Sequence, residues 1–132
     1  MKNTLITIIF VVLLYRCSHA SEPVAGVATF QLSKTEIRAI TSSPKPSGNQ
    51  CYSLYLHYEL FENNKKQAMP WLIQAALKNE PRAQYDYGVI LTDKPETVLM
   101  GLTWLEKAQA NGYKPATKTL NRIKESLKKE RK

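Results

Sequence analysis

Apolar side chains from residue 49 onward recur at steps of three and four positions, which is the spacing of one face of an α-helix. The first such stripe contains Tyr52, Tyr55 and Leu56. Polar segments with helix-ending residues separate the stripes, and they are Asn63-Asn64, Asn79-Glu80-Pro81, Thr92-Asp93-Lys94-Pro95 and Asn111-Gly112-Tyr113-Lys114-Pro115. The pattern predicts an all-α fold with five helices of about 12 to 15 residues each.

Residue types at the ends of the predicted helices support these boundaries. Asn79 and Gly112 are types that accept the left-handed backbone conformation in which many helices end. Pro70 is harder to place, because a proline in a helix interior removes a hydrogen bond and clashes with the preceding turn. We therefore expect the second helix to begin near Gln67, so that Pro70 lies in its first turn.

Residues 21–48 are less periodic and form a separate N-terminal segment and linker. Ser33 and Glu36 have the spacing of a capping box and predict one short helix after Ser33. The residues before it, 24–32, are equally compatible with an extended strand. Residues 41–48 are rich in serine and proline and are expected to form a loop.

An internal repeat organises residues 49–132. When Trp71-Leu72 is aligned with Trp104-Leu105, the same displacement aligns Ala75 with Ala108, Asn79 with Gly112, and Ala83 with Ala116. The resulting 33-residue period accommodates two antiparallel helices and two turns, which is the unit of a helical-hairpin solenoid. The alanines would let neighbouring backbones approach closely, and the two tryptophans would fill the space between hairpins.

Three segments carry a family resemblance: residues 83–89 (Ala-Gln-Tyr-Asp-Tyr-Gly-Val), 104–108 (Trp-Leu-Glu-Lys-Ala) and 111–116 (Asn-Gly-Tyr-Lys-Pro-Ala). They resemble the first helix, the second helix and the following turn of Sel1-like repeats, which are relatives of the tetratricopeptide repeats. The resemblance covers roughly residues 49–127 and implies a short right-handed α-solenoid of about two hairpins and a closing helix. The repeat positions are Trp71, Ala75, Ala83, Gly88, Trp104, Ala108, Gly112 and Ala116.

The sequence departs from the Sel1-like pattern at two places. Residues 92–95 replace the usual glycine-rich turn between the two helices, and Tyr55 occupies the position that corresponds to Gly88. Some exported Sel1-like proteins have a disulfide in every hairpin, and that cysteine pattern does not occur here. These departures affect the expected angle between the helices more than the expected fold.

The resemblance implies a binding scaffold whose inner face is lined by the first helix of each hairpin, near residues 49–62 and 82–91, and by a closing helix near 115–129. The expected protein-binding residues on this face are Tyr52, Ser53, Leu56, Tyr85, Asp86, Val89 and Lys118. We expect Tyr52 and Tyr85 to be the main contacts, because tyrosine offers a large contact area at low entropic cost. The alternative is that both tyrosines are partly buried packing residues.

Residues 1–20 have the layout of a secretory signal peptide. Lys2 precedes an apolar run from Leu5 to Tyr15, and the small residues Ser18 and Ala20 precede a polar segment. The alternative of a retained membrane anchor would need about 20 apolar residues, which is more than this run contains. The bulky and charged residues before Cys17 argue against a lipoprotein. We expect a periplasmic or secreted protein cleaved after Ala20.

No pattern in the sequence points to an enzyme, a metal site or a cofactor. After cleavage Cys51 has no cysteine partner, so it is expected to be buried as a small apolar residue, with a reactive thiol as the alternative. His57 lies six positions further along and would not share a helix face with it. Glu59 and Glu62 are spaced like solvated helix residues rather than a catalytic pair.

The positive charge is concentrated at the C-terminus. The chain has 19 basic and 11 acidic residues, and residues 114–132 hold eight of the basic and two of the acidic ones. Leu120, Ile123 and Leu127 have helical spacing, so this segment is expected to be an amphipathic helix with a basic outer face. Export and the lack of interleaved aromatic residues argue against nucleic-acid binding.

Two functions remain open at this stage. We expect a periplasmic scaffold, an adaptor or an immunity-type protein, that binds a peptide segment or a projecting loop of another protein. The alternative is an envelope-associated protein that docks on anionic lipid or polymer through its basic C-terminal helix.

Overall fold

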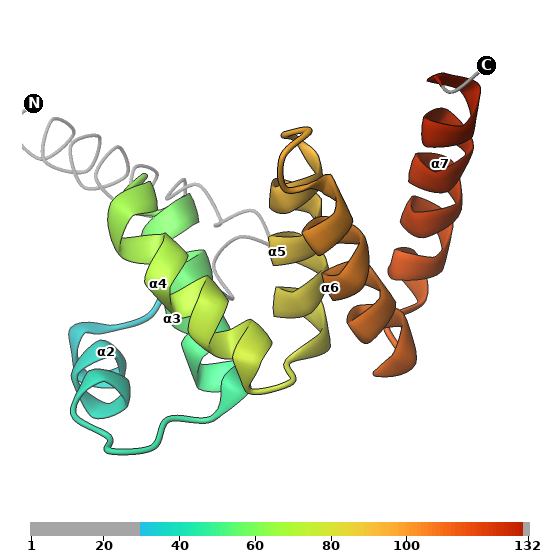
Figure 1. Ribbon diagram of the computed structural model, residues 1–132. Coiled ribbons are helices and arrows are strands. Elements are labelled where there is room, and N and C mark those ends of the chain that lie inside the picture. Colours follow the sequence, from blue (N-terminus) through green and yellow to red (C-terminus); the bar gives the residue numbers. More distant parts are fainter. Residues whose placement is uncertain (1–29, 131–132) are drawn as a thin grey trace, which may run out of the picture. The chain divides into compact units, whose positions relative to one another are not determined.

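The computed structural model describes residues 30–130, which form helices joined by short turns (Figure 1). The helices in chain order are α2 (Lys34–Thr41), α3 (Gly48–Leu60), α4 (Lys65–Leu77), α5 (Pro81–Thr92), α6 (Val98–Ala110) and α7 (Lys114–Glu130). Within this range there is no strand, so the predicted all-α class is confirmed. The expected signal peptide lies outside the described residues.

The helix boundaries follow the 33-residue period of the sequence. Helices α3, α5 and α7 begin at residues 48, 81 and 114, and helices α4 and α6 begin at residues 65 and 98. Each of these helices packs mainly on the next one in the chain, and the closest pairs are α3 with α4 and α5 with α6. Residues 34–130 therefore form two matched hairpins, α3–α4 and α5–α6, followed by α7, with the short α2 packed on α3.

Side-chain caps set the beginnings of three helices. Ser33 and Glu36 form the expected capping box at α2, where the Ser33 hydroxyl accepts from the Glu36 N–H and the Glu36 carboxylate accepts from the Ser33 N–H. Ser47 and Gln50 form a second box at α3. Asn64 caps α4, because its side-chain oxygen accepts a hydrogen bond from the Gln67 N–H at 3.2 Å. Each cap provides partners for N–H groups that a helix start leaves unpaired.

The turns between helices use the left-handed residues that the sequence indicates. Asn79 has φ of 61° and Gly112 has φ of 85°, and they stand at the matched ends of α4 and α6. Asn63, after α3, has φ of 46°. Asparagine and glycine reach this conformation at a lower cost than other residues, which is why they end these helices.

The expected position of Pro70 in the first turn of its helix is wrong. Helix α4 begins at Lys65, before Gln67, because Asn64 supplies the cap. Pro70 is consequently the sixth residue of the helix and cannot donate to the Lys66 carbonyl. Both residues are exposed, so water can bond to that carbonyl. A proline inside a helix still costs about 3 kcal/mol relative to alanine.

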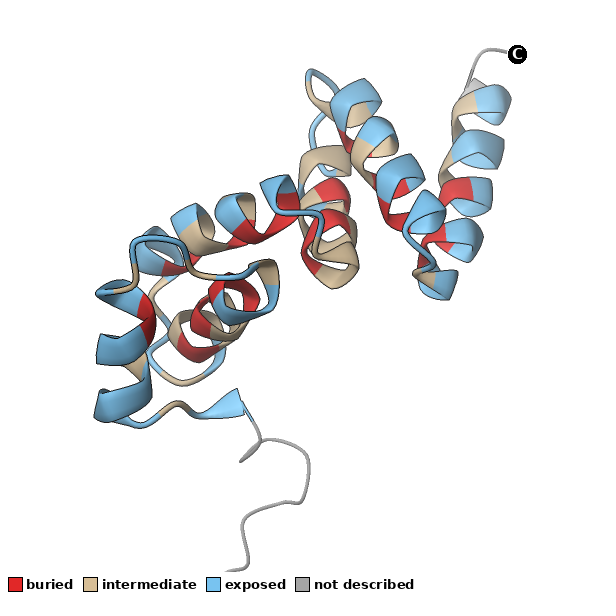
Figure 2. Ribbon diagram, turned by 90° about the horizontal axis from the view of Figure 1, so that it is seen from below, coloured by how far each residue is buried: buried red, intermediate tan, exposed pale blue. Residues whose placement is uncertain are grey.

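The core contains the repeat alanines and neighbouring leucines, and Figure 2 shows the buried residues as bands along the helices. Trp71 and Trp104 are half-buried, and Gly112 is exposed. Leu72 and Leu105 are fully buried at matched positions of α4 and α6. The four repeat alanines, Ala75, Ala83, Ala108 and Ala116, are also fully buried. Their burial agrees with the expected close approach of neighbouring helices. Cys51 is buried, as expected for a cysteine that acts as a small apolar residue.

A buried glutamine connects two of the three turns that carry left-handed residues. The Gln84 side-chain amide donates to the Ala76 carbonyl and to the Asn79 side chain, each at 3.3 Å. Its oxygen accepts from the Asn111 side chain at 2.8 Å. Gln84 thus bonds to the turn before α5 and to the turn before α7, and its burial costs little because its polar atoms have partners.

Helices α5 and α6 approach most closely where two glycines face each other. A Cβ atom on Gly101 would lie 2.7 Å from the Gly88 carbonyl oxygen and 2.9 Å from the Thr92 nitrogen. A Cβ atom on Gly88 would lie 2.9 Å from the Leu105 side chain. The corresponding residues of the first hairpin are Tyr55 and Ala68, so the two hairpins cannot pack identically.

Helix α7 is amphipathic, as the sequence predicts. Leu120 is buried, and Ile123 and Leu127 are half-buried on the same side. Among residues 30–130, no helix combines the length and the apolar character needed to cross a lipid bilayer.

We predict that Gly101→Ala lowers the free energy of unfolding by about 1 to 3 kcal/mol, because the new methyl group overlaps backbone atoms of α5. Urea denaturation followed by circular dichroism measures the change. The control is Thr103→Ala, an exposed position on the same helix, which should change stability by less than about 0.5 kcal/mol. Equal effects of the two substitutions would contradict the close contact.

Candidate functional site

Matched hydrogen bonds join helices α3, α5 and α7. The Tyr52 hydroxyl of α3 donates to Asp86 Oδ2 of α5 at 2.7 Å. At the same positions one repeat later, the hydroxyls of Tyr85 and Thr119 hydrogen-bond at 3.1 Å. The first helices and the closing helix are thus connected in series by tyrosines at matched repeat positions. This series defines the candidate site, which we call the α3–α5–α7 face.

Arg82 adds a second contact between α3 and α5. Its Nη2 donates to the Asn49 side-chain oxygen at 2.6 Å, and its guanidinium carbon lies 4.7 Å from the centre of the Tyr52 ring. Its Nε also pairs with the Glu80 carboxylate at 2.8 Å. The Tyr52 ring is consequently covered by a cation at its face while its hydroxyl is held by Asp86.

The expected role of Tyr52 as an exposed contact is not supported, because only 8% of the residue is accessible. Burial, followed by the hydrogen bond to Asp86, raises the pKa of the Tyr52 hydroxyl far above its ordinary value. The group is therefore a neutral donor at all physiological pH values. In this structure Tyr52 is the packing residue of the alternative interpretation, and the Asp86 contact is the physical reason.

Tyr85 is half-buried and lies between α5 and α7. Its ring packs on Tyr113 with 5.1 Å between ring centres. Tyr85 thus keeps more accessible surface than the buried Tyr52.

The remaining predicted contact residues differ in exposure. Ser53 is half-buried and its hydroxyl donates to the Asn49 carbonyl at 3.1 Å. Leu56 is half-buried and packs on the core cluster around Tyr52. Val89 is half-buried and Lys118 is exposed. The structure thus brings Tyr52 and Asp86 together directly, whereas Leu56 contributes to packing.

Asp86 is a partly buried carboxylate between two tyrosine-bearing helices. Burial raises its pKa, and this effect outweighs the hydrogen bond from Tyr52 and the positive charge of Arg82, which both lower it. The folded protein therefore holds a proton on Asp86 more readily than the unfolded chain does.

Two cavities lie at successive repeat junctions. The first has a volume of about 350 Å³ and is lined by Tyr55, Glu59, Lys65, Met69, Ile90 and Asp93. The second has a volume of about 260 Å³ and is lined by Thr92, Asp93, Pro95, Val98 and Leu127. Glu59 and Thr92 are matched repeat positions, and so are Lys65 and Val98. The cavities are thus two versions of one junction, and Asp93 lines both.

Acidic groups influence the tyrosine of the first cavity. Burial raises the pKa of Tyr55 to about 12, and the nearby charges of Asp86 and Glu59 act in the same direction. Ile90, Met69 and Asp93 are not among the site residues that the sequence predicts. The sequence does contain one signal for this cavity, which is Tyr55 at the repeat position that corresponds to Gly88. A large side chain at a glycine position needs more space between the neighbouring helices.

Cys51 and His57 have separate partners, as their spacing indicates. The Cys51 thiol donates to the Gln74 side-chain oxygen at 3.4 Å, and burial raises its pKa. His57 Nδ1 accepts from the Leu32 N–H at 3.2 Å, and Nε2 lies 3.2 Å from a Glu62 oxygen. Across residues 30–130, no group of three or more His, Cys, Asp or Glu side chains is arranged to hold a metal ion.

Comparison with known protein families, curated proteins and solved structures finds no match to this chain. The Sel1-like resemblance consequently stays a prediction that rests on the residues quoted above.

We predict that Tyr52→Phe lowers the free energy of unfolding by about 1 to 3 kcal/mol, because it removes a hydrogen bond to a partly buried carboxylate. The matched substitution Tyr85→Phe removes a bond between two neutral hydroxyls and should cost about 0.5 to 1.5 kcal/mol. Urea denaturation of the two variants measures both values. A larger loss for Tyr85→Phe than for Tyr52→Phe would contradict the assignment.

We also predict a pH dependence at Asp86. The pKa of Asp86 is 3.8 in the unfolded chain and higher in the folded protein. Its contribution to the free energy of unfolding therefore falls as pH rises from 3.8 to the higher pKa of the folded state. The difference in unfolding free energy between wild type and Asp86→Asn should therefore shift in favour of wild type as pH is lowered from about 7 to about 4. Denaturation curves at several pH values test this, and a shift in the opposite direction would contradict it.

Proposed function

We propose that this protein is an exported interaction module that binds a peptide segment or a projecting loop of another protein along the α3–α5–α7 face. The observation that carries the proposal is the serial connection of these helices at matched positions, Tyr52 with Asp86 and Tyr85 with Thr119. A repeated connection of this kind aligns equivalent side chains of successive repeats, and a ligand that extends across several repeats can contact them together.

The proposal includes a Sel1-like right-handed α-solenoid as the architecture. Support comes from helix starts at 33-residue intervals and from left-handed residues at the matched positions Asn79 and Gly112. Fully buried alanines at the repeat positions give further support. In such an array each unit contacts mainly its neighbours, and that is the pattern of helix packing here.

The two junction cavities supply the binding chemistry of the proposed site. The first combines apolar surface from Met69 and Ile90 with the charges of Glu59, Asp93 and Lys65. The second is mainly apolar, with Val98, Pro95 and Leu127 around Asp93. An extended peptide with a basic side chain for the first cavity and an apolar one for the second would match both, because opposite charge and apolar burial are satisfied together.

Export is part of the proposal and rests on the signal-peptide layout that ends at Ala20. In the periplasm such a module would serve as an adaptor in an envelope process or as an immunity-type protein. Both roles require only a binding surface.

One observation favours a second function, docking on anionic lipid or polymer through α7. Six basic residues of this helix are exposed: Lys114, Lys118, Arg122, Lys124, Lys128 and Lys129. Lys124 is 2.9 Å from the exposed Glu106 carboxylate, a contact that contributes little to stability at the surface. Near an anionic surface, basic residues contribute about 1 kcal/mol each.

We predict that a photo-crosslinking phenylalanine analogue at position 90, at the rim of the first cavity, forms an adduct with one protein in cells that export the chain. Asp93→Lys places a long cation in both cavities, which should weaken the free energy of partner binding by about 1 kcal/mol. The amount of adduct should therefore fall at least about fivefold. The matched control is Glu96→Lys, which makes the same charge change at a nearby exposed position outside both cavities. Mass spectrometry identifies the adduct.

A second control places the analogue at Leu99, which is 70% exposed on α6, where no adduct with the same protein is expected. Equal adducts from positions 90 and 99, or equal effects of Asp93→Lys and Glu96→Lys, would contradict binding at the junction cavities. If no adduct forms and the protein instead pellets with anionic vesicles at low salt, docking through α7 replaces the scaffold function.

A further inference from the structure

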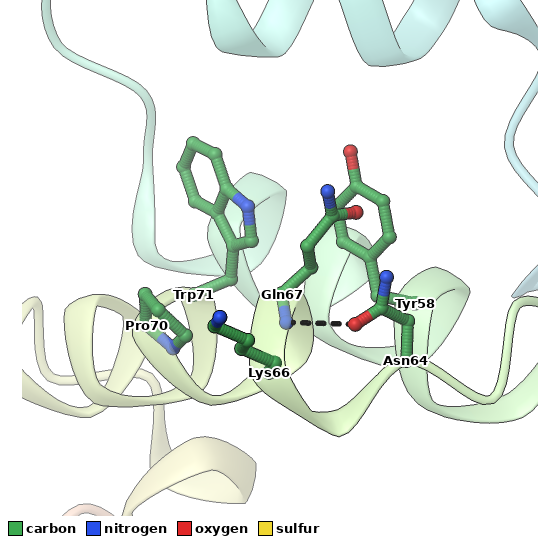
Figure 3. Close-up of a pocket in the computed structure, with 6 residues that line it drawn as sticks. All are labelled: Tyr58, Asn64, Lys66, Gln67, Pro70 and Trp71. Atoms are coloured by element: carbon green, nitrogen blue, oxygen red, sulfur yellow. Dashed lines mark hydrogen bonds between the residues drawn. The ribbon is translucent and has the colours of Figure 1, made fainter.

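A third cavity lies on the α3–α4 hairpin, separate from the junction cavities. Its volume is about 590 Å³, and its described lining residues are Tyr58, Asn64, Lys66, Gln67, Pro70 and Trp71. Figure 3 shows the side chains of Trp71, Gln67 and Tyr58 pointing to the same side of the hairpin. Two aromatic rings and a proline thus form the apolar part of this cavity, which we call the Trp71 cavity.

The polar groups of the Trp71 cavity are mostly donors. The Asn64 side-chain oxygen already accepts from the Gln67 N–H at 3.2 Å, so both Asn64 amide hydrogens but only one of the two oxygen lone pairs remain for a ligand (Figure 3). The Trp71 indole N–H and the Lys66 ammonium can only donate. No carboxylate is among the described lining residues. A ligand with several acceptors and few donors would therefore match this cavity.

The second hairpin provides an internal comparison. Trp104, the repeat equivalent of Trp71, packs edge-on against Tyr87 at 5.5 Å, and the Lys107 ammonium lies 4.3 Å from its ring centre. The positions that correspond to Tyr87 and Lys107 in the first hairpin are Leu54 and Gln74. Within the described residues, Trp104 is thus covered by the Tyr87 ring and the Lys107 cation, whereas Trp71 faces a cavity.

Pro70 is an independent sign that this surface has a role beyond folding. A proline inside a helix opposes local helix stability, and its matched position in α6 is Thr103. The ring lies next to Trp71 in the cavity wall. Residues that contradict a local folding rule without a packing gain are expected at functional sites.

We propose that the Trp71 cavity binds a proline-rich segment of another protein in the polyproline II conformation. Proline rings pack between aromatic side chains, and grooves lined by aromatic residues recognise such segments. Proline residues also present backbone carbonyls without N–H groups, which complements a surface of donors. The stiffness of this conformation lowers the entropy lost on binding. The inference concerns a different surface from the α3–α5–α7 face and does not depend on it.

Carbohydrate is the main competing ligand for an aromatic cavity. Sugar hydroxyls donate as well as accept, so they need acceptors, and the described lining offers fewer acceptors than donors: the Gln67 oxygen, the Tyr58 hydroxyl and the remaining lone pair of the Asn64 oxygen. A cationic ligand would need a carboxylate and would meet Lys66. The donor-rich chemistry favours the proline-rich peptide over both.

The test uses the two tryptophans of the chain as reporters in the purified protein. Their indole N–H signals in two-dimensional NMR are assigned with Trp71→Phe and Trp104→Phe. Titration with a ten-residue oligoproline should shift the Trp71 signal in a saturable way and leave the Trp104 signal in place. A ten-residue Gly-Ser peptide should shift neither signal.

Gln67→Glu then probes the donor chemistry, because it places a carboxylate opposite the peptide carbonyls at an exposed position that leaves the fold intact. It should weaken oligoproline binding at least about tenfold, whereas Gln109→Glu, the same change on exposed α6 surface, should not. The proposal is overturned if the Trp71 signal does not shift, if the Gly-Ser peptide shifts it equally, or if Gln67→Glu has no effect. It is also overturned if an oligosaccharide such as chitohexaose shifts the signal and oligoproline does not.

Discussion

The arrangement of the helices depends on how closely consecutive backbones can approach. At the junction of α4 and α5 the small residues are Ala75 and Ala83, and both are fully buried. Within the second hairpin the contact is tighter, because Gly88 and Gly101 leave no room for a methyl group. The distance between two packed helix axes depends on the side chains between them. Small residues at each repeat therefore set the spacing on which the cavities and hydrogen bonds of the α3–α5–α7 face depend.

The two hairpins differ because the first one has larger residues at the positions where the second one has two glycines. Tyr55 replaces the glycine of α5, and Ala68 replaces the glycine of α6. Tyr55 lines the first junction cavity, where burial and nearby carboxylates raise its pKa to about 12. The same hairpin also carries Pro70 and Trp71, which line the Trp71 cavity.

Most of the fold could be predicted from the sequence because its determinants are local. The capping box at Ser33, the left-handed residues Asn79 and Gly112, and the 33-residue period all correspond to features of the described residues. The start of α4 was placed too late, because the cap from Asn64 extends the helix toward its N-terminus in spite of Pro70. The caps and turn residues act over a single helical turn, and the 33-residue period repeats them along the chain, so both can be recognised in the sequence.

The candidate site was less predictable because its determinants are distant in the chain. Tyr52 has the periodicity of an inner-face residue, but its exposure is set by Asp86 and Arg82, which belong to a different hairpin. The difference between Trp71 and Trp104 likewise depends on residues that are not repeated: Tyr87 on the neighbouring helix α5 and Lys107 one turn along α6. In a repeat fold the period fixes equivalent backbone positions, whereas the environment of each equivalent side chain depends on non-equivalent neighbours. Chemistry that distinguishes one repeat from the next is therefore the part that only the three-dimensional arrangement reveals.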